Sequence, residues 1–426
     1  MNIIRRIYCR AFQLCFRAAL PLLPYREPEI LEDMESLGQV LTRKGKTSVL
    51  IVTDKGISGL GLLKGLTDAL EKAGVSCAVY DGTVQNPTID NVEQARAAYL
   101  KNHCSAIIAF GGGSSIDCAK AAGARIAKPR QPVRKMRGLL KIHRKLPTLV
   151  AIPTTAGTGS ETTLAAVITD SATHHKYPIN DFVLIPRYAV LDYRVTAGLP
   201  KQITATTGMD ALTHAVEAYI GGSTTKLTRS MAEEAVCRIR SDLKKAYDDG
   251  NDAKARESML RAAYCAGIAF TRSYVGYVHG VAHSLGGRYG IPHGLANAVI
   301  LPYFLEEYGE SCEKRLGKLA RVCGIASKEA DDHGASREFI QWVREMNRSM
   351  EIPDKIEGIQ EADIRQMAAH ADKESNPLYP VPRLMDADEL AAMYHRIALQ
   401  EEGHPRNAEK NKAGSAVGAK LKHAIL

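Results

Sequence analysis

A glycine loop between an apolar segment and a helix-like segment constrains the fold most strongly. Residues 106–110 (AIIAF) are apolar, Gly111–Gly113 follow, and a small-residue stretch begins at Ser114. A short apolar run of this kind predicts a buried strand. Glycines let backbone N–H groups approach a phosphate, and a following helix directs its positive end at that phosphate. The segment is either a phosphate-binding strand–loop–helix unit or an ordinary turn.

The first half of the chain alternates between strand-like and helix-like segments. Strands are predicted at 48–54, 77–80, 106–110, 147–153 and within 183–191, with helices at 60–73, 89–102 and from 114 or 115. Alternation of this type predicts a parallel, doubly wound sheet. After residue 200 the strand pattern ends. Helices are expected at 206–220 (with a threonine cap), 226–249, 253–271, 274–286, 295–307, 313–323, 335–348, 361–372 and 388–400. The sequence thus predicts an α/β domain over 27–200 and an all-α domain over 201–402.

Three further features bear on a nucleotide ligand. Pro153–Thr163 is a cluster of glycine and hydroxyl residues directly after a predicted strand. Between Asp117 and Glu161 there are ten Lys and Arg and no acid, which is either a positive field for an anionic cofactor or a solvated basic loop. Asp54 ends a strand, where a carboxylate accepts hydrogen bonds from a ribose and repels a 2′-phosphate. The alternative for Asp54 is a turn residue before Gly56.

Ligand-type side chains gather in the predicted helical half. Asp210 and His214 are four residues apart, as are His279 and His283, and His293 stands at a helix start. Their neighbours are mostly small and apolar, and polar groups are costly to bury there without partners. These five side chains indicate a bound cation. One carboxylate with two or three imidazoles fits Fe(II) or Zn(II) better than Mg²⁺ or Ca²⁺.

Four segments together resemble the iron-containing (group III) alcohol dehydrogenase family: GGGSSIDCAK, PTTAGTGSE, GMDALTHAVEAY and HGVAHSLGGRYGIPHGLANA. Their order and spacing match over roughly residues 27–400. The resemblance implies the dehydroquinate synthase-like fold of that family, with an N-terminal dinucleotide-binding domain, an all-helical C-terminal domain and the active site between them. It also implies hydride transfer between a primary alcohol and its aldehyde, with NAD as cofactor and Fe(II) polarising the substrate oxygen. The ligand set itself accepts Zn(II) as well.

The same resemblance assigns residues. It implies a metal held by Asp210, His214, His279 and His293, and it makes His283, Asp210 and His279 catalytic, with His283 beside the metal without binding it. His283 is interpreted as orienting the substrate or relaying its proton. The implied cofactor contacts are Gly111, Gly112, Gly113, Ser114, Thr154, Thr155 and Thr158, with Asp117 and Lys176 placed less securely and Asp54 selecting NAD. Phe270 and Tyr274 either line the substrate pocket or pack between helices.

The formal charge of +9 comes from the two ends of the chain. Residues 1–26 contain five Arg and no acid, 403–426 add a net charge of four, and the intervening residues are balanced. A nucleic-acid partner is therefore not expected. Residues 2–20 predict a basic amphipathic helix with three alternatives: its apolar face docks on the body or a second subunit, it lies on an anionic membrane surface, or it is a targeting peptide. The tail 403–426 is expected to fray.

Cysteine usage points to a reducing compartment. The nine Cys are odd in number and lack C-x-x-C spacing, so we expect a cytoplasmic protein without a disulfide framework. A small alcohol or aldehyde is the expected substrate and a homodimer or higher homo-oligomer the expected assembly. The alternatives are a polyol (glycerol-type) dehydrogenase, a dehydroquinate-synthase-like lyase and, in another class, a membrane-associated binding protein.

Overall fold

The first half of the chain forms a parallel sheet. The computed structural model describes residues 1–172 and 175–399. Six strands lie in the order β1-β9-β6-β4-β2-β3, and every neighbouring pair is parallel. Their bounds are Glu29–Leu31 (β1), Tyr188–Val190 (β9), Thr148–Pro153 (β6), Ala106–Gly111 (β4), Ser48–Val52 (β2) and Ser76–Tyr80 (β3). This is the predicted doubly wound arrangement.

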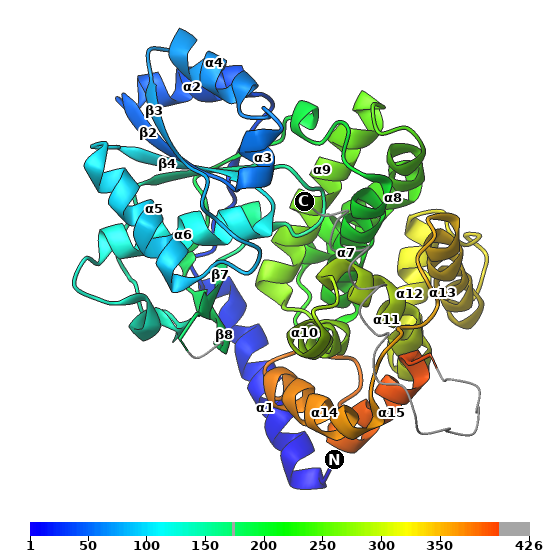
Figure 1. Ribbon diagram of the computed structural model, residues 1–426. Helices are drawn as coiled ribbons and strands as arrows, with labels where there is room; N and C mark the ends of the chain where they lie inside the picture. The colour runs from blue at the N-terminus through cyan, green and yellow to red at the C-terminus, as the bar shows by residue number, and fades with distance from the viewer. Residues whose placement is uncertain (173–174, 400–426) are drawn as a thin grey trace, which may run out of the picture.

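Helices cover both faces of this sheet (Figure 1). Val49 and Ile51 of β2 pack with α2 (Met34–Arg43) and α4 (Lys64–Lys72) in one apolar cluster. The alternate residues of β2 pack with α5 (Ile89–Lys101) and α6 (Gly113–Ala127) in another. Successive strand side chains point to opposite faces, so a continuous apolar strand is what a sheet covered on both sides requires.

The carboxyl ends of β2, β4 and β6 share one edge of the sheet. Gly111 is in register with Pro153, and the Thr154 N–H donates to the Gly111 carbonyl at 3.1 Å. Asp54 follows β2, which pairs with β4 on its other side. Ligands of open parallel sheets bind at this edge.

The second half is helical. It consists of α7 (Lys201–Ile220), α8 (Lys226–Asp248), α9 (Ala253–Ser273), α10 (Tyr277–Tyr289), α11 (His293–Tyr308), α12 (Glu310–Val322), α13 (Asp332–Ser349), α14 (Glu361–Ser375) and α15 (Ala387–Ile397). One large apolar cluster joins these helices. In Figure 1 they form a separate mass beside the sheet. The chain thus has an α/β domain followed by an all-helical domain, as expected.

Several local predictions are wrong. Helix α7 starts at Lys201 rather than 206, directly after Pro200, and no side-chain cap precedes it. Pro200 stands at the N-cap position and offers no side-chain acceptor, so the helix begins without the threonine cap inferred from the sequence. The predicted helix 60–73 is α4, preceded by the short α3 (Lys55–Gly59).

A small second sheet was not predicted. It contains β5 (Gly138–Leu139), β7 (Ala165–Asp170) and β8 (His175–Asn180), with β7 and β8 antiparallel. The sequence analysis assigned no strand between residue 163 and residue 183. The strand β8 brings Lys176 towards the site described below.

The chain begins with a helix, α1 (Ile3–Ala19), which lies at the edge of the molecule beside α14 (Figure 1). This agrees with the amphipathic helix predicted for 2–20. In the part of the chain that the structure describes, no helix is both long enough and apolar enough to cross a membrane. The basic tail 403–426 lies outside the described residues.

Candidate active site

Four ligand-type side chains from three helices converge on one point. Asp210 and His214 come from α7, His279 from α10, and His293 is the first residue of α11. One ligand atom of each lies within 4.8 Å of the others. Gly294 makes this approach possible, because a Cβ there would lie 2.4 Å from the Thr206 carbonyl oxygen on α7. Any larger residue would push the start of α11 away.

The imidazoles of this cluster are neutral donors of lone pairs. Burial lowers the pKa of His214 and of His279, and it lowers that of His293 to about 4. Neutral imidazole nitrogens and one carboxylate are the donors that Fe(II) and Zn(II) prefer. The residues present therefore fit the divalent metal that the sequence predicted.

The Asn297 side chain lies where the ligand atoms of this cluster converge. Its amide nitrogen lies 2.7 Å from Asp210 Oδ1, 3.2 Å from His279 Nε2 and 3.1 Å from His293 Nε2. Three acceptor atoms thus face one position. Asn297 stands one helical turn after His293, but the sequence analysis did not select it.

Glu217 holds His279 in place and was also missed. Its carboxylate is buried and accepts hydrogen bonds from the Gly276 and Val278 N–H groups at 2.8 and 2.9 Å. Glu217 Oε2 lies 2.6 Å from His279 Nδ1. This contact leaves His279 Nε2 free to face the cluster, which is how a carboxylate orients a metal-binding histidine. Burial raises the pKa of Glu217 to about 7.

His283 lies beside the cluster and not within it. Its ring stacks on that of His293 with centroids 5.1 Å apart. On its other side, His283 Nδ1 is 2.6 Å from Glu374 Oε1, which also accepts from the Tyr379 hydroxyl at 2.7 Å. His283 and Glu374 are partly exposed, so the pair links the cluster to solvent. Glu374 and Tyr379 were not identified from the sequence.

Phe270 contributes a wall to the cluster. Its ring stacks on His214 with a centroid separation of 4.1 Å. Tyr274 instead contacts Phe16 of α1 edge to face at 5.0 Å.

The glycine loop lies at the edge of the sheet, against residues 153–163, which we call the threonine loop. Gly111 ends β4 with φ +152°, Gly112 precedes α6, and Gly113 and Ser114 begin that helix. A Cβ on Gly112 would lie 3.7 Å from Thr155 Oγ1, and one on Gly113 would lie 3.5 Å from Thr158 Oγ1. The loop, the hydroxyl groups and the α6 N-terminus therefore form one polar surface suited to a phosphate.

The threonine loop connects the two domains. Gly157 packs so closely on α7 that a Cβ would lie 2.6 Å from the Thr207 carbonyl oxygen, three residues before Asp210. Within α6, Lys120 is fully buried and donates to the Ser160, Thr163 and Ala165 carbonyl oxygens at 2.7–2.9 Å. Lys120 thus fixes this loop between the sheet and the cluster.

The remaining predicted contacts are distributed around this surface. Asp54 Oδ1 accepts from the Ile57 N–H at 3.0 Å and caps α3, while its Oδ2 lies 3.5 Å from Ser115 Oγ. Asp117 accepts from the Val167 N–H at 3.0 Å. Lys176 bonds Asn86 at 2.6 Å. Burial lowers the pKa of Lys176, although Asp117 and Glu374 oppose this shift. Lys176 therefore lies between the two halves of the site.

Three side chains of the basic stretch have partners within the protein. Arg134 makes a bidentate pair with Asp170 at 2.5 and 2.8 Å, and Arg125 pairs with Glu93. The Lys120 ammonium donates its hydrogen bonds to residues 160–165. These three side chains are therefore not a field for the cofactor.

Sequence comparisons identify the family. The iron-containing alcohol dehydrogenase model matches residues 31–193, and the C-terminal model of the same family matches residues 204–398. The chain belongs to the iron-containing alcohol dehydrogenase family.

Relatives of this chain carry names that differ in substrate. Alcohol dehydrogenase 4 of Schizosaccharomyces pombe is 37% identical over 356 residues, which is 82% of each chain. A crystal structure of 1,3-propanediol oxidoreductase is 32% identical with a TM-score of 0.83, covering 88% of this chain and 98% of that one. Sulfoacetaldehyde reductase from Bifidobacterium kashiwanohense in complex with NAD⁺ is 27% identical with a TM-score of 0.79, covering 88% and 99%. The family is an oxidoreductase family, and the substrate varies within it.

Proposed function

We propose that this iron-containing alcohol dehydrogenase interconverts a small primary alcohol and its aldehyde with NAD(H). The observation that carries the proposal is the convergence of Asp210, His214, His279 and His293 next to the threonine loop that contacts α7. A dinucleotide on the glycine loop would extend towards this cluster from the edge of the sheet. When bound, the divalent metal would polarise the substrate oxygen and NAD would accept or return the hydride.

Each residue of the site has a distinct task in this proposal. Asp210, His214, His279 and His293 hold the metal, and Glu217 fixes the His279 ring. His283 holds or moves the hydroxyl proton at its imidazole, with Glu374 as its partner towards solvent. Phe270 excludes water from one side of His214.

For the cofactor, we propose that Gly111–Ser114, Thr154, Thr155 and Thr158 bind the pyrophosphate. We include Asp117 and Lys176 as further candidate cofactor contacts. Asp54 is our candidate for selecting NAD over NADP. Fe(II) is the proposed metal because of the family, although the donor set accepts Zn(II). We also expect a homo-oligomer.

A panel of short aldehydes tests the reaction. Anaerobically purified protein is expected to oxidise NADH with short aldehydes, and Asp210→Ala and His279→Ala should each lose this activity by at least about a hundredfold. His370→Ala on the exposed side of α14 is the matched control and should retain it. Unchanged activity in both site variants would contradict the proposed site.

A diol dehydrogenase is the second candidate. The structural similarity to 1,3-propanediol oxidoreductase favours including 1,3-propanediol in the panel. A kcat/KM for this diol at least about tenfold above that for ethanol or 1-propanol would select the second candidate.

A further inference from the structure

Helix α1 is attached to the body through polar side chains. Arg5 makes a bidentate pair with Asp372 at 2.8 and 2.7 Å, and Arg10 donates to the Val381 and Pro382 carbonyl oxygens at 2.7 and 2.8 Å. Gln13 donates to the Tyr379 and Pro377 carbonyl oxygens at 2.7 and 3.2 Å. Of the alternatives for this helix, docking of its apolar face on the body is therefore not what the structure shows, and a second subunit stays an alternative.

The apolar face of α1 points away from the body. Ile3, Ile4, Ile7 and Leu14 are 68%, 77%, 63% and 64% exposed. At 100° per residue they share one arc with Ala11, Cys15 and Ala18, opposite the buried Cys9 and Gln13. The polar anchors prevent the helix from rolling this face inwards.

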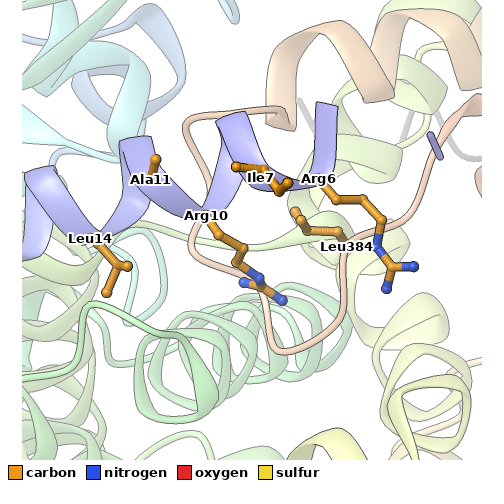
Figure 2. Close-up of a pocket in the computed structure, with 6 residues that line it drawn as sticks. All are labelled: Arg6, Ile7, Arg10, Ala11, Leu14 and Leu384. Atoms are coloured by element: carbon orange, nitrogen blue, oxygen red, sulfur yellow. The ribbon is translucent and has the colours of Figure 1, made fainter. Parts of the chain in front are cut away.

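A hollow beside α1 continues this apolar surface. It has a volume of about 420 Å³ and is lined by Arg6, Ile7, Arg10, Ala11, Leu14 and Leu384 (Figure 2). Its walls combine aliphatic side chains with two guanidinium groups. A surface of this composition suits a ligand that offers acyl carbon and negative charge together.

Helix α1 contributes only positive charge to this face, and the acids near its start, Asp386 and Glu389, face the Met1 amino group. Residues 1–26 contain no acid, and Arg6 and Arg17 remain exposed next to the apolar arc. Burial lowers the pKa of Arg315, and repulsion from Arg17 and Arg229 adds to this shift. The nearby Asp372 is already paired with Arg5 on the opposite side of α1.

This charge pattern favours one of two candidate partners for the α1 face: a second copy of the chain or an anionic phospholipid surface. In a two-fold contact between copies with α1 on the axis, the apolar arc would meet itself. Antiparallel α1 helices would then bring Arg6 of one copy towards Arg17 of the other without an acid on either helix. An anionic phospholipid surface supplies both the apolar phase and the negative charge.

We propose that α1 docks this enzyme on an anionic phospholipid membrane, with Ile3, Ile4, Ile7 and Leu14 in the acyl boundary and Arg6 and Arg17 at the headgroups. The helix lies parallel to the membrane plane. This role is independent of the proposed reaction.

Vesicle co-sedimentation tests the docking of the full-length protein. Wild type should bind phosphatidylcholine vesicles containing one quarter phosphatidylglycerol at least tenfold more tightly than pure phosphatidylcholine. Ile7→Glu/Leu14→Glu should lose at least tenfold of this affinity, and Arg6→Gln/Arg17→Gln should lose most of its dependence on salt. Leu139→Glu/Val322→Glu is the matched control, because both residues are exposed elsewhere (57% and 50%), and it should bind as wild type.

Two outcomes would overturn the proposal. Equal vesicle binding by wild type and Ile7→Glu/Leu14→Glu would assign any binding to another segment, such as the basic tail, which all variants retain. Failure of wild type to bind the anionic vesicles is the second such outcome. If Ile7→Glu/Leu14→Glu then halves the molar mass in sedimentation equilibrium, the occupant of the α1 face is a second copy of the chain. Unfolding temperatures within about 2 °C of wild type would show that the variants are folded.

Discussion

At the scale of single residues, the site depends on side chains that support its principal groups. Glu217 is the clearest case, since one buried carboxylate holds two backbone N–H groups and His279 Nδ1. Helical spacing selected five candidates including His283, and the family resemblance implied the four that the structure brings together. The sequence analysis did not single out Glu217 or Glu374, because the sequence does not distinguish an acid that faces solvent from one that contacts an imidazole.

We predict that Glu217→Gln weakens metal binding about 10- to 100-fold. The amide would place an N–H group against the N–H donors of Gly276 or Val278. Competition with a coloured chelator measures the metal affinity directly. Glu233→Gln, which alters a hydrogen bond to Tyr219, is the control and should leave that affinity unchanged.

For Glu374→Gln we expect kcat for aldehyde reduction to fall about tenfold or more, with little change in the dissociation constant for NADH. The variant removes the partner that orients His283. Steady-state kinetics with fluorescence titration of NADH separate these two effects. Glu361→Gln at the start of the same helix should have wild-type kinetics, and a parallel loss there would contradict a specific role.

The cofactor preference also belongs to this scale. Asp54→Asn preserves a helix-capping side chain but removes the charge, so it should raise the NADPH/NADH ratio of kcat/KM on the order of tenfold. Both ratios are read from initial rates at saturating aldehyde. No change in the ratio would make Asp54 only the cap of α3.

At the scale of elements, α6 supports the site from two positions. Its N-terminus faces the glycine loop, and Lys120 further along fixes the threonine loop. The strand and helix elements of both domains could be predicted because their apolar periodicities are strong. The β7–β8 pair was missed although the burial of β7 alternates as in a half-buried strand, and Pro178 within β8 disfavours a strand there.

We predict that Lys120→Met destabilises the protein by about 3 kcal/mol and weakens NADH binding. The substitution leaves buried carbonyl oxygens without their hydrogen-bond donor while nearly keeping the length of the side chain. Urea unfolding and NADH titration measure the two effects. Lys128→Met near the end of the same helix should cost less than about 1 kcal/mol, and an equal loss there would contradict the assigned role.

At the scale of the whole molecule, the two domains are held in register by the loop 153–163, which carries proposed cofactor contacts. The opposite ends of the site come from the sheet edge and from α7, α10 and α11, and Gly157 joins them. The sequence located the net charge at the chain ends correctly. It did not fix the orientation of α1. An amphipathic pattern shows that the helix has two faces, but it does not show which face contacts the body.

Removing the metal should lower the stability of the whole chain. A ligand present at a hundred times its dissociation constant stabilises the folded state by about 2.7 kcal/mol. Chelator-treated protein is therefore expected to unfold at a lower temperature in calorimetry, and Fe(II) or Zn(II) should restore the wild-type value. Asp210→Ala should unfold at the same temperature with and without chelator.

The metal content of anaerobically purified protein tests the central claim most directly. Elemental analysis should find close to one divalent transition metal per chain in wild type and in His370→Ala. In Asp210→Ala and His279→Ala it should find less than about a tenth of that. Wild-type metal content in both site variants would contradict a metal held by Asp210, His214, His279 and His293.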